Sequence, residues 1–302
     1  MDSETYHLIW HIAYIAIMIP IVIGNGLILI SIARFPRLRT NMHLLIGNLA
    51  VSDLIVGALL IPYSLITREY VNRNMYICFG KLCLFVFSLG SSCYNLMLIS
   101  LERFVSITFP LHCKTYMTLP RLGALIAFGW AITLFNGTLP MYGWHIYSEN
   151  NTQCVSDTLW TQAYKHMVNW ELIVSLLINF ALYSMVARIA LRKACDRTQI
   201  KAGLTVHAKY DRDVHQILTL VIVLGLFAIC WLPYAAVVVI VTFHETPTWQ
   251  YVRRCTLIPG IINSAVNWVV YGFRNEDFRK AFKSILSFKR NSETSVSSSQ
   301  TA

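Results

Sequence analysis

The sequence predicts an all-α membrane protein: seven transmembrane helices packed as a bundle, followed by a short amphipathic helix on the membrane surface. Of the 302 residues, 56% are hydrophobic and only 13% are charged, whereas a soluble domain carries about 25% charged residues. Seven apolar segments are each long enough to cross a bilayer, which takes roughly 17–25 residues with few ionisable groups. The basic residues also gather in alternate loops.

The first apolar segment, 8–33, follows the acidic residues Asp2 and Glu4. Because it lacks a basic start and a small-residue cleavage site, it predicts a first span rather than a cleaved signal peptide. The connections are short and no repeat is visible, which favours a single helical domain at 1–286. The remaining predicted spans are 44–66, 75–107, 122–142, 166–191, 215–243 and 255–273.

The net charge of +10 predicts membrane topology rather than nucleic-acid binding. Lys and Arg concentrate in the loops after the first, third and fifth spans and in the C-terminal segment. The positive-inside rule places these loops in the cytoplasm and the N-terminus outside the cell. We therefore expect a multi-pass plasma-membrane protein, with part of its basic charge available to anionic inner-leaflet lipids or to a partner.

Three polar stretches punctuate the second half of the chain. The stretch 194–210 has mixed charge and predicts a polar cytoplasmic link between the fifth and sixth spans. In 275–286, Phe278 and Phe282 recur at helical spacing opposite basic residues, which predicts an amphipathic surface helix. The Ser/Thr-rich stretch 287–302 is poor in apolar residues and predicts a disordered cytoplasmic tail.

Two cysteines on the outer side of the membrane predict a disulfide. Cys78 begins the third span, and Cys154 lies in the longest outer loop. Most other cysteines fall within spans or on the cytoplasmic side, where a structural disulfide is not expected, although Cys83 and Cys255 compete as partners. The same outer loop contains Asn150 in an Asn-x-Thr glycosylation sequon.

Polar side chains inside the spans are costly, and they indicate either function or helix packing. If the spans pack in sequence order, a carboxylate, hydroxyls and amides from three of them reach a similar depth. These groups could hold a hard monovalent cation with water, or form a hydrogen-bond network that joins helices. Spacing alone leaves both interpretations open. The residues are Asp53, Ser92, Asn263, Ser264 and Asn267.

The third span ends in a charged pair, Glu102 and Arg103. Arg103 has a second candidate partner in Asp213, just before the sixth span, and this contact would restrain the sixth helix. Composition alone favours a simpler account, in which the arginine snorkels to the interface. In the sixth span Pro233 predicts a kink, which makes the nearby Trp231 a candidate lever. Prolines are also tolerated in membrane helices without any such role.

The sequence contains no constellation typical of an enzyme. We find no His/Cys cluster at metal-ligand spacing, no glycine-rich phosphate loop and no Ser/His/Asp set at one depth. The histidines are scattered along the chain. We therefore expect a non-enzymatic protein that requires no cofactor.

Taken together, these residues resemble the rhodopsin-like (class A) G-protein-coupled receptors over nearly the whole chain, from about 23 to 282. Each motif alone is weak, but all of them occur in order on seven spans. The matching residues are Gly24-Asn25, Leu49-Ala50-Val51-Ser52-Asp53, Cys78, Glu102-Arg103-Phe104, Trp130, Cys154, Tyr183, Phe227, Cys230-Trp231-Leu232-Pro233, Asn263-Ser264, Asn267, Tyr271 and Phe278-Arg279.

The resemblance implies a heterotrimeric G protein as partner, with arrestin as a further one. Arg103 would leave an intramolecular lock and contact the G protein, and Trp231 would sense the ligand. Tyr183 and Tyr271 would meet near Arg103 in the active state, and Leu111 would pack onto the G protein. Implied sodium ligands are Asp53, Ser92, Asn263 and Asn267, and the implied coupling and switch residues are Glu102, Arg103, Leu111, Tyr183, Asp213, Phe227, Trp231 and Tyr271.

Several positions depart from the family pattern. The usual proline of helix five is Ser175, and the Asn-Pro-x-x-Tyr motif of helix seven reads Asn267-Trp268-Val269-Val270-Tyr271. Without these prolines, helix five is expected to be straighter and helix seven to lose a kink. Phe85 replaces the aspartate of aminergic receptors, and Ile261 stands where an opsin carries its retinal lysine. Neither an ordinary amine receptor nor an opsin is therefore expected.

The segment 139–144 and the missing helix-five proline resemble the branch that holds adenosine, cannabinoid and lysolipid receptors. Val238 stands where adenosine receptors carry a purine-binding asparagine, which counts against adenosine itself. A lipid or small amphipathic ligand is expected, although Glu171 could instead take a cationic ligand or hydrogen-bond to its neighbours while protonated. The predicted lining residues are Phe85, Val86, Leu89, Tyr164, Met167, Glu171, Trp231, Tyr234, Val238, Leu257 and Ile261.

We thus expect a receptor in which an extracellular agonist favours a state with helix six swung outward, which the G protein then binds. Amine and nucleoside receptors of the same fold are alternatives. Trp268 and Ser175 also leave open a non-signalling decoy. The intramembrane carboxylates Asp53 and Glu171 leave open a transporter, but the internal repeats and broken-helix pairs typical of transporters are not apparent.

Overall fold

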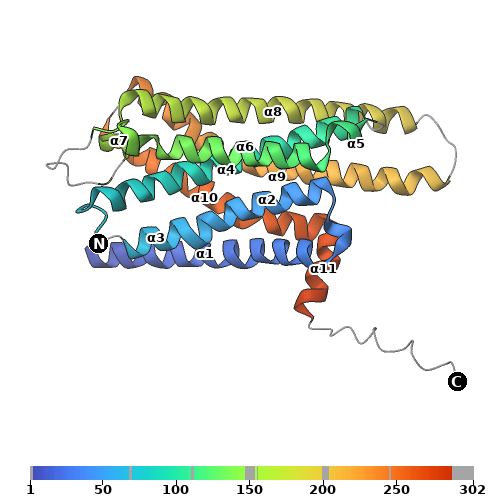
Figure 1. The fold of residues 1–302 in the computed structure, drawn as a ribbon, viewed down its shortest axis with the longest axis horizontal. Helices are drawn as coiled ribbons and strands as arrows, with labels where there is room; N and C mark the ends of the chain where they lie inside the picture. Colours follow the sequence, from blue (N-terminus) through green and yellow to red (C-terminus); the bar gives the residue numbers. More distant parts are fainter. Residues whose placement is uncertain are drawn as a thin grey trace.

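Long helices running side by side form the structure, a computed structural model that describes residues 3–67, 70–109, 112–146, 154, 156–198, 204–244 and 246–287 (Figure 1). Within these residues the only strand-like feature is an isolated bridge between His145 and Trp160. The predicted all-α bundle is confirmed. The helices are α1 (Ser3–Arg34), η1 (Pro36–Leu38), α2 (Asn41–Ile55), η2 (Val56–Leu60), α3 (Ile61–Ile66), α4 (Met75–Thr108), α5 (Cys113–Tyr116), α6 (Leu119–Thr138), η3 (Leu139–Tyr142), α7 (Ser156–Leu159), α8 (Gln162–Thr198), α9 (Leu204–Phe243), α10 (Pro247–Arg274) and α11 (Glu276–Leu286).

Six helical segments in the described part of the chain are long and apolar enough to cross a membrane. They lie in α1, in the continuous run from α2 through η2 to α3, and in α4, α6, α8 and α9. The seventh long helix, α10, is more polar because it carries the buried residues Arg253, Asn263 and Asn267. Seven long helical segments therefore match the seven predicted spans.

The helices of the fifth and sixth spans extend well beyond the predicted apolar segments. The stretch 194–210, expected as a polar link, is helical up to Thr198 in α8 and again from Leu204 in α9. Ala, Arg, Lys and Leu are good helix formers, so both helices continue after the apolar pattern ends. Hydropathy marks where a helix leaves the membrane, not where it stops.

The second span contains a feature that the sequence analysis missed. A π-helical turn, η2, joins α2 to α3, and Pro62 is the second residue of α3. Proline has no N–H to donate and its ring crowds the preceding turn, and a wider turn accommodates both effects. The π-turn lets the span continue to Ile66 without a break.

α4 occupies the centre of the bundle, since it packs against α2, α6 and α8. The ring closes through α8 on α9, α9 on α10, and α10 on α1. The largest core cluster follows this order, with Leu96 and Ile99 of α4 packed among residues of α2, α9 and α10. α4 is therefore the helix on which neighbouring spans converge.

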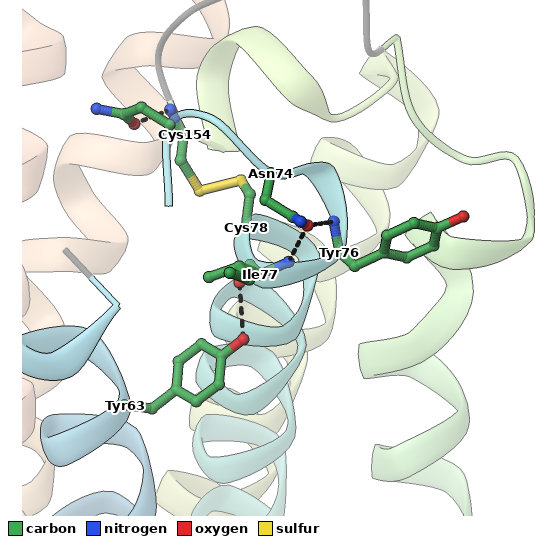
Figure 2. Close-up of a disulfide and its surroundings, with 7 residues drawn as sticks. Tyr63, Asn74, Tyr76, Ile77, Cys78 and Cys154 are labelled. Atoms are coloured by element: carbon green, nitrogen blue, oxygen red, sulfur yellow. Dashed lines mark hydrogen bonds between the residues drawn. A yellow bond between two sulfur atoms is a disulfide. The ribbon is translucent and has the colours of Figure 1, made fainter. Parts of the chain in front are cut away.

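One end of the bundle, called here the disulfide end, holds the bond between Cys78 and Cys154 (Figure 2). The two Cα atoms lie 5.6 Å apart across a sequence separation of 76 residues. The predicted disulfide is confirmed, whereas its competitors Cys83 and Cys255 are free thiols. Asn150, the predicted glycosylation site in this loop, lies outside the described residues.

Local hydrogen bonds fix the start of α4 at this end (Figure 2). The Asn74 side chain accepts bonds from the backbone N–H groups of Tyr76 and Ile77, at 2.9 and 3.2 Å. The Tyr63 hydroxyl donates to the Ile77 carbonyl at 3.0 Å. An N-cap and a tyrosine from α3 thus hold the helix turn that carries Cys78.

The opposite end, called the α11 end, carries the predicted amphipathic helix. Asn275 caps α11 by accepting from the N–H groups of Asp277 and Phe278, so the helix begins one residue later than predicted. Phe278, Ala281 and Phe282 are buried, and α11 packs against α10 and α1. The predicted tail, apart from Ser287 at its start, lies outside the described residues.

The disulfide predicts a non-additive pair of mutations. Cys78→Ser and Cys154→Ser should each lower the free energy of unfolding by about 2–4 kcal/mol, because the long loop is then unconstrained in the unfolded chain. The double variant should be no less stable than either single variant. Thermal unfolding of the purified protein in nanodiscs measures this, with Cys255→Ser as the control. Additive losses would show that the two sulfurs act independently.

Candidate functional site

A buried polar contact joins the second and seventh spans. Asn267 of α10 donates from Nδ2 to Oδ2 of Asp53 in α2 at 2.9 Å, and both side chains are buried. Ser92 of α4 and Asn263 of α10, the other predicted sodium ligands, are also buried. The structure therefore brings Asp53 and Asn267 into contact, at the similar depth that was expected for them.

Three oxygen atoms in this region are buried without a hydrogen-bond donor among the described residues. They are Oδ1 of Asp53, Oδ1 of Asn263 and Oδ1 of Asn25. Buried acceptors are normally paired, so each of these oxygens is available to a water molecule or a cation. Within the described chain no three or more His, Cys, Asp or Glu side chains gather at metal-binding distance. One carboxylate with neutral oxygens suits a monovalent cation better than a divalent one.

A second polar network, next to this region, was not predicted as a unit. Asn48 of α2 donates to Oδ1 of Asn95 in α4. Asn95 in turn donates from Nδ2 to the Ser52 hydroxyl at 2.6 Å. Trp130 of α6 donates from Nε1 to Oδ1 of Asn48 at 2.9 Å. Three spans are thus held together by satisfied hydrogen bonds, which supports the helix-packing interpretation for these residues.

At the α11 end, Arg103 lies in an ion pair. Its Nε is 2.9 Å from Oε2 of the adjacent Glu102 and donates to Sδ of Met42 in α2 at 3.2 Å. Both side chains of the pair are largely buried, with exposed fractions of 12% and 7%. Asp213 lies in α9, but its side chain is outside the described residues, as is all of Leu111.

Two tyrosines near this end are buried with no hydrogen-bond partner for their hydroxyls among the described residues. Tyr183 of α8 is 8% exposed and Tyr271 of α10 is 1% exposed. Leaving a buried hydroxyl without a partner costs about 1–3 kcal/mol. A conformation in which the two hydroxyls form hydrogen bonds would therefore be lower in free energy by this amount for each hydroxyl.

Trp231 packs between two aromatic side chains of α9 and a glycine of α10. Its ring lies 6.2 Å from that of Phe227 and 6.0 Å from that of Tyr234, centroid to centroid. A Cβ built on Gly260 would lie only 2.6 Å from the Trp231 ring. The Trp231 ring therefore packs directly against Gly260. A larger residue at position 260 would not fit without moving the indole.

The predicted lining residues are spread over the three hydrophobic clusters of the bundle. Phe85 contacts all three hydrophobic clusters of the bundle, including the one that holds Val86. Leu89, Leu257, Tyr234 and Val238 pack with the central cluster, whereas Ile261 packs against α1 and the second span. Met167 packs with the cluster at the disulfide end. Phe85 is thus the point where these surfaces meet.

Glu171 and Tyr164 both bind Asn136 of α6, a residue that was not among the predicted site residues. Asn136 donates from Nδ2 to both Glu171 oxygens, at 3.0 and 3.1 Å, and its carbonyl accepts from the Tyr164 hydroxyl at 2.8 Å. Val86, Leu89, Glu171 and Ser175 help to line a cavity of about 20 Å³ between α4 and α8. This space holds about one water molecule.

The tryptophan that replaces the helix-seven proline has a specific packing partner. A Cβ built on Gly24 of α1 would lie 2.1 Å from the Trp268 ring. Beside it, Asn25 donates to the backbone carbonyl of Ser264 at 3.1 Å. The indole and the glycine interlock α10 with α1 at a place where a smaller residue would leave a gap.

These features are those of a seven-transmembrane receptor, and comparison with known sequences identifies the family. A profile of the "7 transmembrane receptor (rhodopsin family)" matches residues 24–271. The chain therefore belongs to the rhodopsin family and is a class A G-protein-coupled receptor, a multi-pass membrane protein.

Its relatives lie in more than one branch of that family. Adenosine receptor A2b of Mus musculus is 26% identical, over 95% of this chain and 92% of the relative. The A2b receptor of Homo sapiens is also 26% identical, over 88% and 86% of the two chains. G-protein coupled receptor 3 of Homo sapiens is 29% identical, over 85% and 76%.

The Trp268 contact predicts a position-specific effect of glycine replacement. Gly24→Ala should lower the free energy of unfolding by about 1–3 kcal/mol, because its methyl group overlaps the indole. Gly26→Ala is the matched control, since a Cβ there meets nothing within 4 Å. Thermal unfolding of both variants in nanodiscs gives the comparison. Trp268→Ala should remove the difference between them, and a persistent difference would refute the interlock.

Proposed function

We propose that this receptor binds a lipid or small amphipathic agonist at the disulfide end and activates a heterotrimeric G protein at the α11 end. Outward movement of α9 would open the cytoplasmic surface. The observation that carries the proposal is the buried pair Arg103–Glu102. A charge that must contact a soluble partner is here held inside the bundle, as a resting state requires.

The unpaired phenols of Tyr183 and Tyr271 support a second state of the bundle. Their hydroxyls lack partners among the described residues, so a rearrangement that pairs them through each other or through water recovers a free-energy cost. The same rearrangement would release Arg103 from Glu102. Gains of a few kcal/mol suffice to shift a two-state equilibrium from minor to major.

Ligand binding and G-protein binding would be linked through this equilibrium. A ligand shifts it only by its differential affinity for the two states. An agonist that favours the outward position of α9 therefore raises the affinity for the G protein, and the G protein raises the affinity for the agonist by the same factor. Trp231, seated against Gly260, would transmit the ligand's position to α9.

The lining residues favour a largely apolar agonist. Phe85, Leu257 and Val238 belong to or pack against the central hydrophobic cluster. Glu171, the candidate partner for an amine, already accepts two hydrogen bonds from Asn136. An amine would have to replace or share that contact, which lowers its advantage.

A nucleoside agonist is the second candidate, because relatives named adenosine receptors share 25–27% of the sequence. Val238 argues against it: this apolar side chain is 1% exposed in the cluster. Adenosine tested beside lipids in one exchange assay separates the two candidates. A response to adenosine alone would favour the nucleoside.

We also propose an allosteric sodium ion at Asp53, Ser92, Asn263 and Asn267. The oxygens left without donors on Asp53 and Asn263 support it. When bound, the ion would neutralise the buried carboxylate and join α2 to α10. The chain's own contribution is the Asn267 amide, which orients Asp53.

The remaining assignments of the proposal concern orientation and further partners. The disulfide end, with the N-terminus and a glycan at Asn150, would face outside the cell at the plasma membrane. The α11 end would face the cytoplasm, where arrestin could bind and the exposed Arg279 and Lys283 of α11 would meet anionic lipids. A receptor that activates no G protein would instead be the decoy.

Replacing Arg103 tests G-protein activation. Arg103→Ala should reduce nucleotide exchange on a responsive G protein at least tenfold, because the contact that replaces the Glu102 pair is lost. The assay uses purified receptor in nanodiscs with a panel of purified G proteins. Arg37→Ala, which removes an exposed cation at the same end, is the matched control. Equal exchange by wild type and Arg103→Ala would refute the assignment.

Sodium binding predicts ion-specific stabilisation. Wild-type receptor should unfold at a higher temperature in sodium chloride than in N-methylglucamine chloride, because an ion that binds only the folded state stabilises it by mass action. Asp53→Asn should abolish the difference. Asp277→Asn, which changes a carboxylate that is 42% exposed, should keep it. A sodium effect that survives Asp53→Asn would place the ion elsewhere.

A further inference from the structure

A buried arginine near the disulfide end has no role in the functions described above. Arg253 lies in the second turn of α10 and is 8% exposed. Its backbone carbonyl accepts from the Thr256 hydroxyl at 2.8 Å, which leaves the guanidinium uninvolved in that bond. A buried arginine is favourable only when it is paired or hydrogen-bonded, and Arg253 does have an interaction within the protein.

Arg253 lies on the helix face that carries the α10 residues of the proposed pocket. Leu257 and Ile261 follow it at intervals of four residues, which places all three along one side of the helix. The eight-residue step from Arg253 to Ile261 spans about 12 Å at 1.5 Å per residue. A cation therefore stands at one end of an apolar path along α10.

The two apolar residues of this path, Leu257 and Ile261, each pack against buried apolar surface, although not of the same cluster. Leu257 packs against the central cluster that contains Trp231 and Tyr234. Ile261 and Phe85 both pack with the cluster formed by α1 and the second span. An alkyl chain lying along this face would replace contacts with side chains of similar polarity.

Among the described residues, the two charged side chains of the proposed pocket, Arg253 and Glu171, favour an anion over a cation as the polar group of the ligand. Glu171 is held by both of its oxygens to Asn136. Arg253 also contacts the protein itself, but a guanidinium has five N–H donors and can keep that contact while binding a ligand. Its planar fork matches a carboxylate or phosphate.

We propose that Arg253 binds the anionic head group, carboxylate or phosphate, of a single-chain amphiphile whose tail extends past Leu257 toward Ile261 and Trp231. This inference rests on the proposed agonist site and specifies its ligand class. In this proposal Arg253 determines the specificity for a negatively charged head group. The apolar residues along α10 provide the affinity for the ligand's alkyl tail.

The test compares amphiphiles that share one chain and differ in head-group charge. Oleate and oleoyl lysophosphatidate carry the two anionic heads, oleamide is neutral, and oleylamine is cationic. Each is titrated into full-length receptor in nanodiscs, and binding is measured from the increase in unfolding temperature. Both anionic compounds, or one of them, should bind at least tenfold more tightly than oleamide, and which of them binds identifies the head group.

Arg253→Ala should reduce the affinity for the anionic probe by about 10- to 100-fold, as expected for a lost charge-assisted hydrogen bond. Its affinity for oleamide should change less than threefold. Arg73→Ala, which removes an exposed cation near the same end, should leave both affinities unchanged. Equal binding of oleate, lysophosphatidate and oleamide by wild type, or equal losses for charged and neutral probes in Arg253→Ala, would overturn the proposal.

Charge reversal keeps the proposal falsifiable if the alanine variant is unstable. Arg253→Glu should lose the anionic probe and gain preference for oleylamine over oleate, which a structural role for Arg253 would not produce. Nucleotide exchange is measured in parallel. Probe binding without exchange would contradict the proposed coupling alone, whereas constitutive exchange with no charge preference would contradict the head-group assignment alone.

Discussion

The need to pair polar groups inside an apolar bundle is the constraint on which this structure depends. In a bilayer there is no water to satisfy them, so polar side chains bond either to the backbone of their own helix or to a partner on another helix. Asn95 does so with Asn48 and Ser52, and Asn267 does so with Asp53. These contacts fix which faces of α2, α4 and α10 meet, because a rotation of any of these helices would separate the pairs.

Incomplete pairing is as informative as pairing. The oxygens of Asp53 and Asn263 and the hydroxyls of Tyr183 and Tyr271 are buried without partners in the described chain. A bundle built only for stability would fill such places with apolar side chains, which often costs nothing. Unsatisfied groups on α2, α8 and α10 instead supply a free-energy difference that an ion or a second conformation can use.

The sequence predicted the seven spans, the disulfide and the similar depth of Asp53 and Asn267, because each follows from local hydropathy, sidedness or depth. It did not predict that these two side chains bond to each other. It could not predict that Asn136 would bind Glu171, because hydrophobic periodicity and membrane depth do not show which faces of α6 and α8 meet. The Trp130 bond to Asn48 was missed for the same reason. The π-turn before Pro62 and the extension of α8 to Thr198 depend on backbone adjustments that apolar periodicity does not record.

The departures from the family pattern assign different mechanical roles to α9 and α10. The Trp268 ring packs against Gly24, and Asn25 donates a hydrogen bond to the backbone carbonyl of Ser264. These two contacts hold α10 against α1. The proline inside α10 is Pro259, nearer the disulfide end, and no proline kink is therefore expected at Trp268 itself.

α10 also contains Gly260. In our proposals it contributes the head-group site at Arg253 and one side of the ion site. α9, by contrast, contains Pro233 within its span and rests on α10 through the indole of Trp231. In the proposed mechanism, a ligand that pushes against α10 would relieve the contact by displacing α9. On that proposal, the substitutions at positions 175 and 268 would leave activation through the sixth span intact and would restrict motion of the seventh.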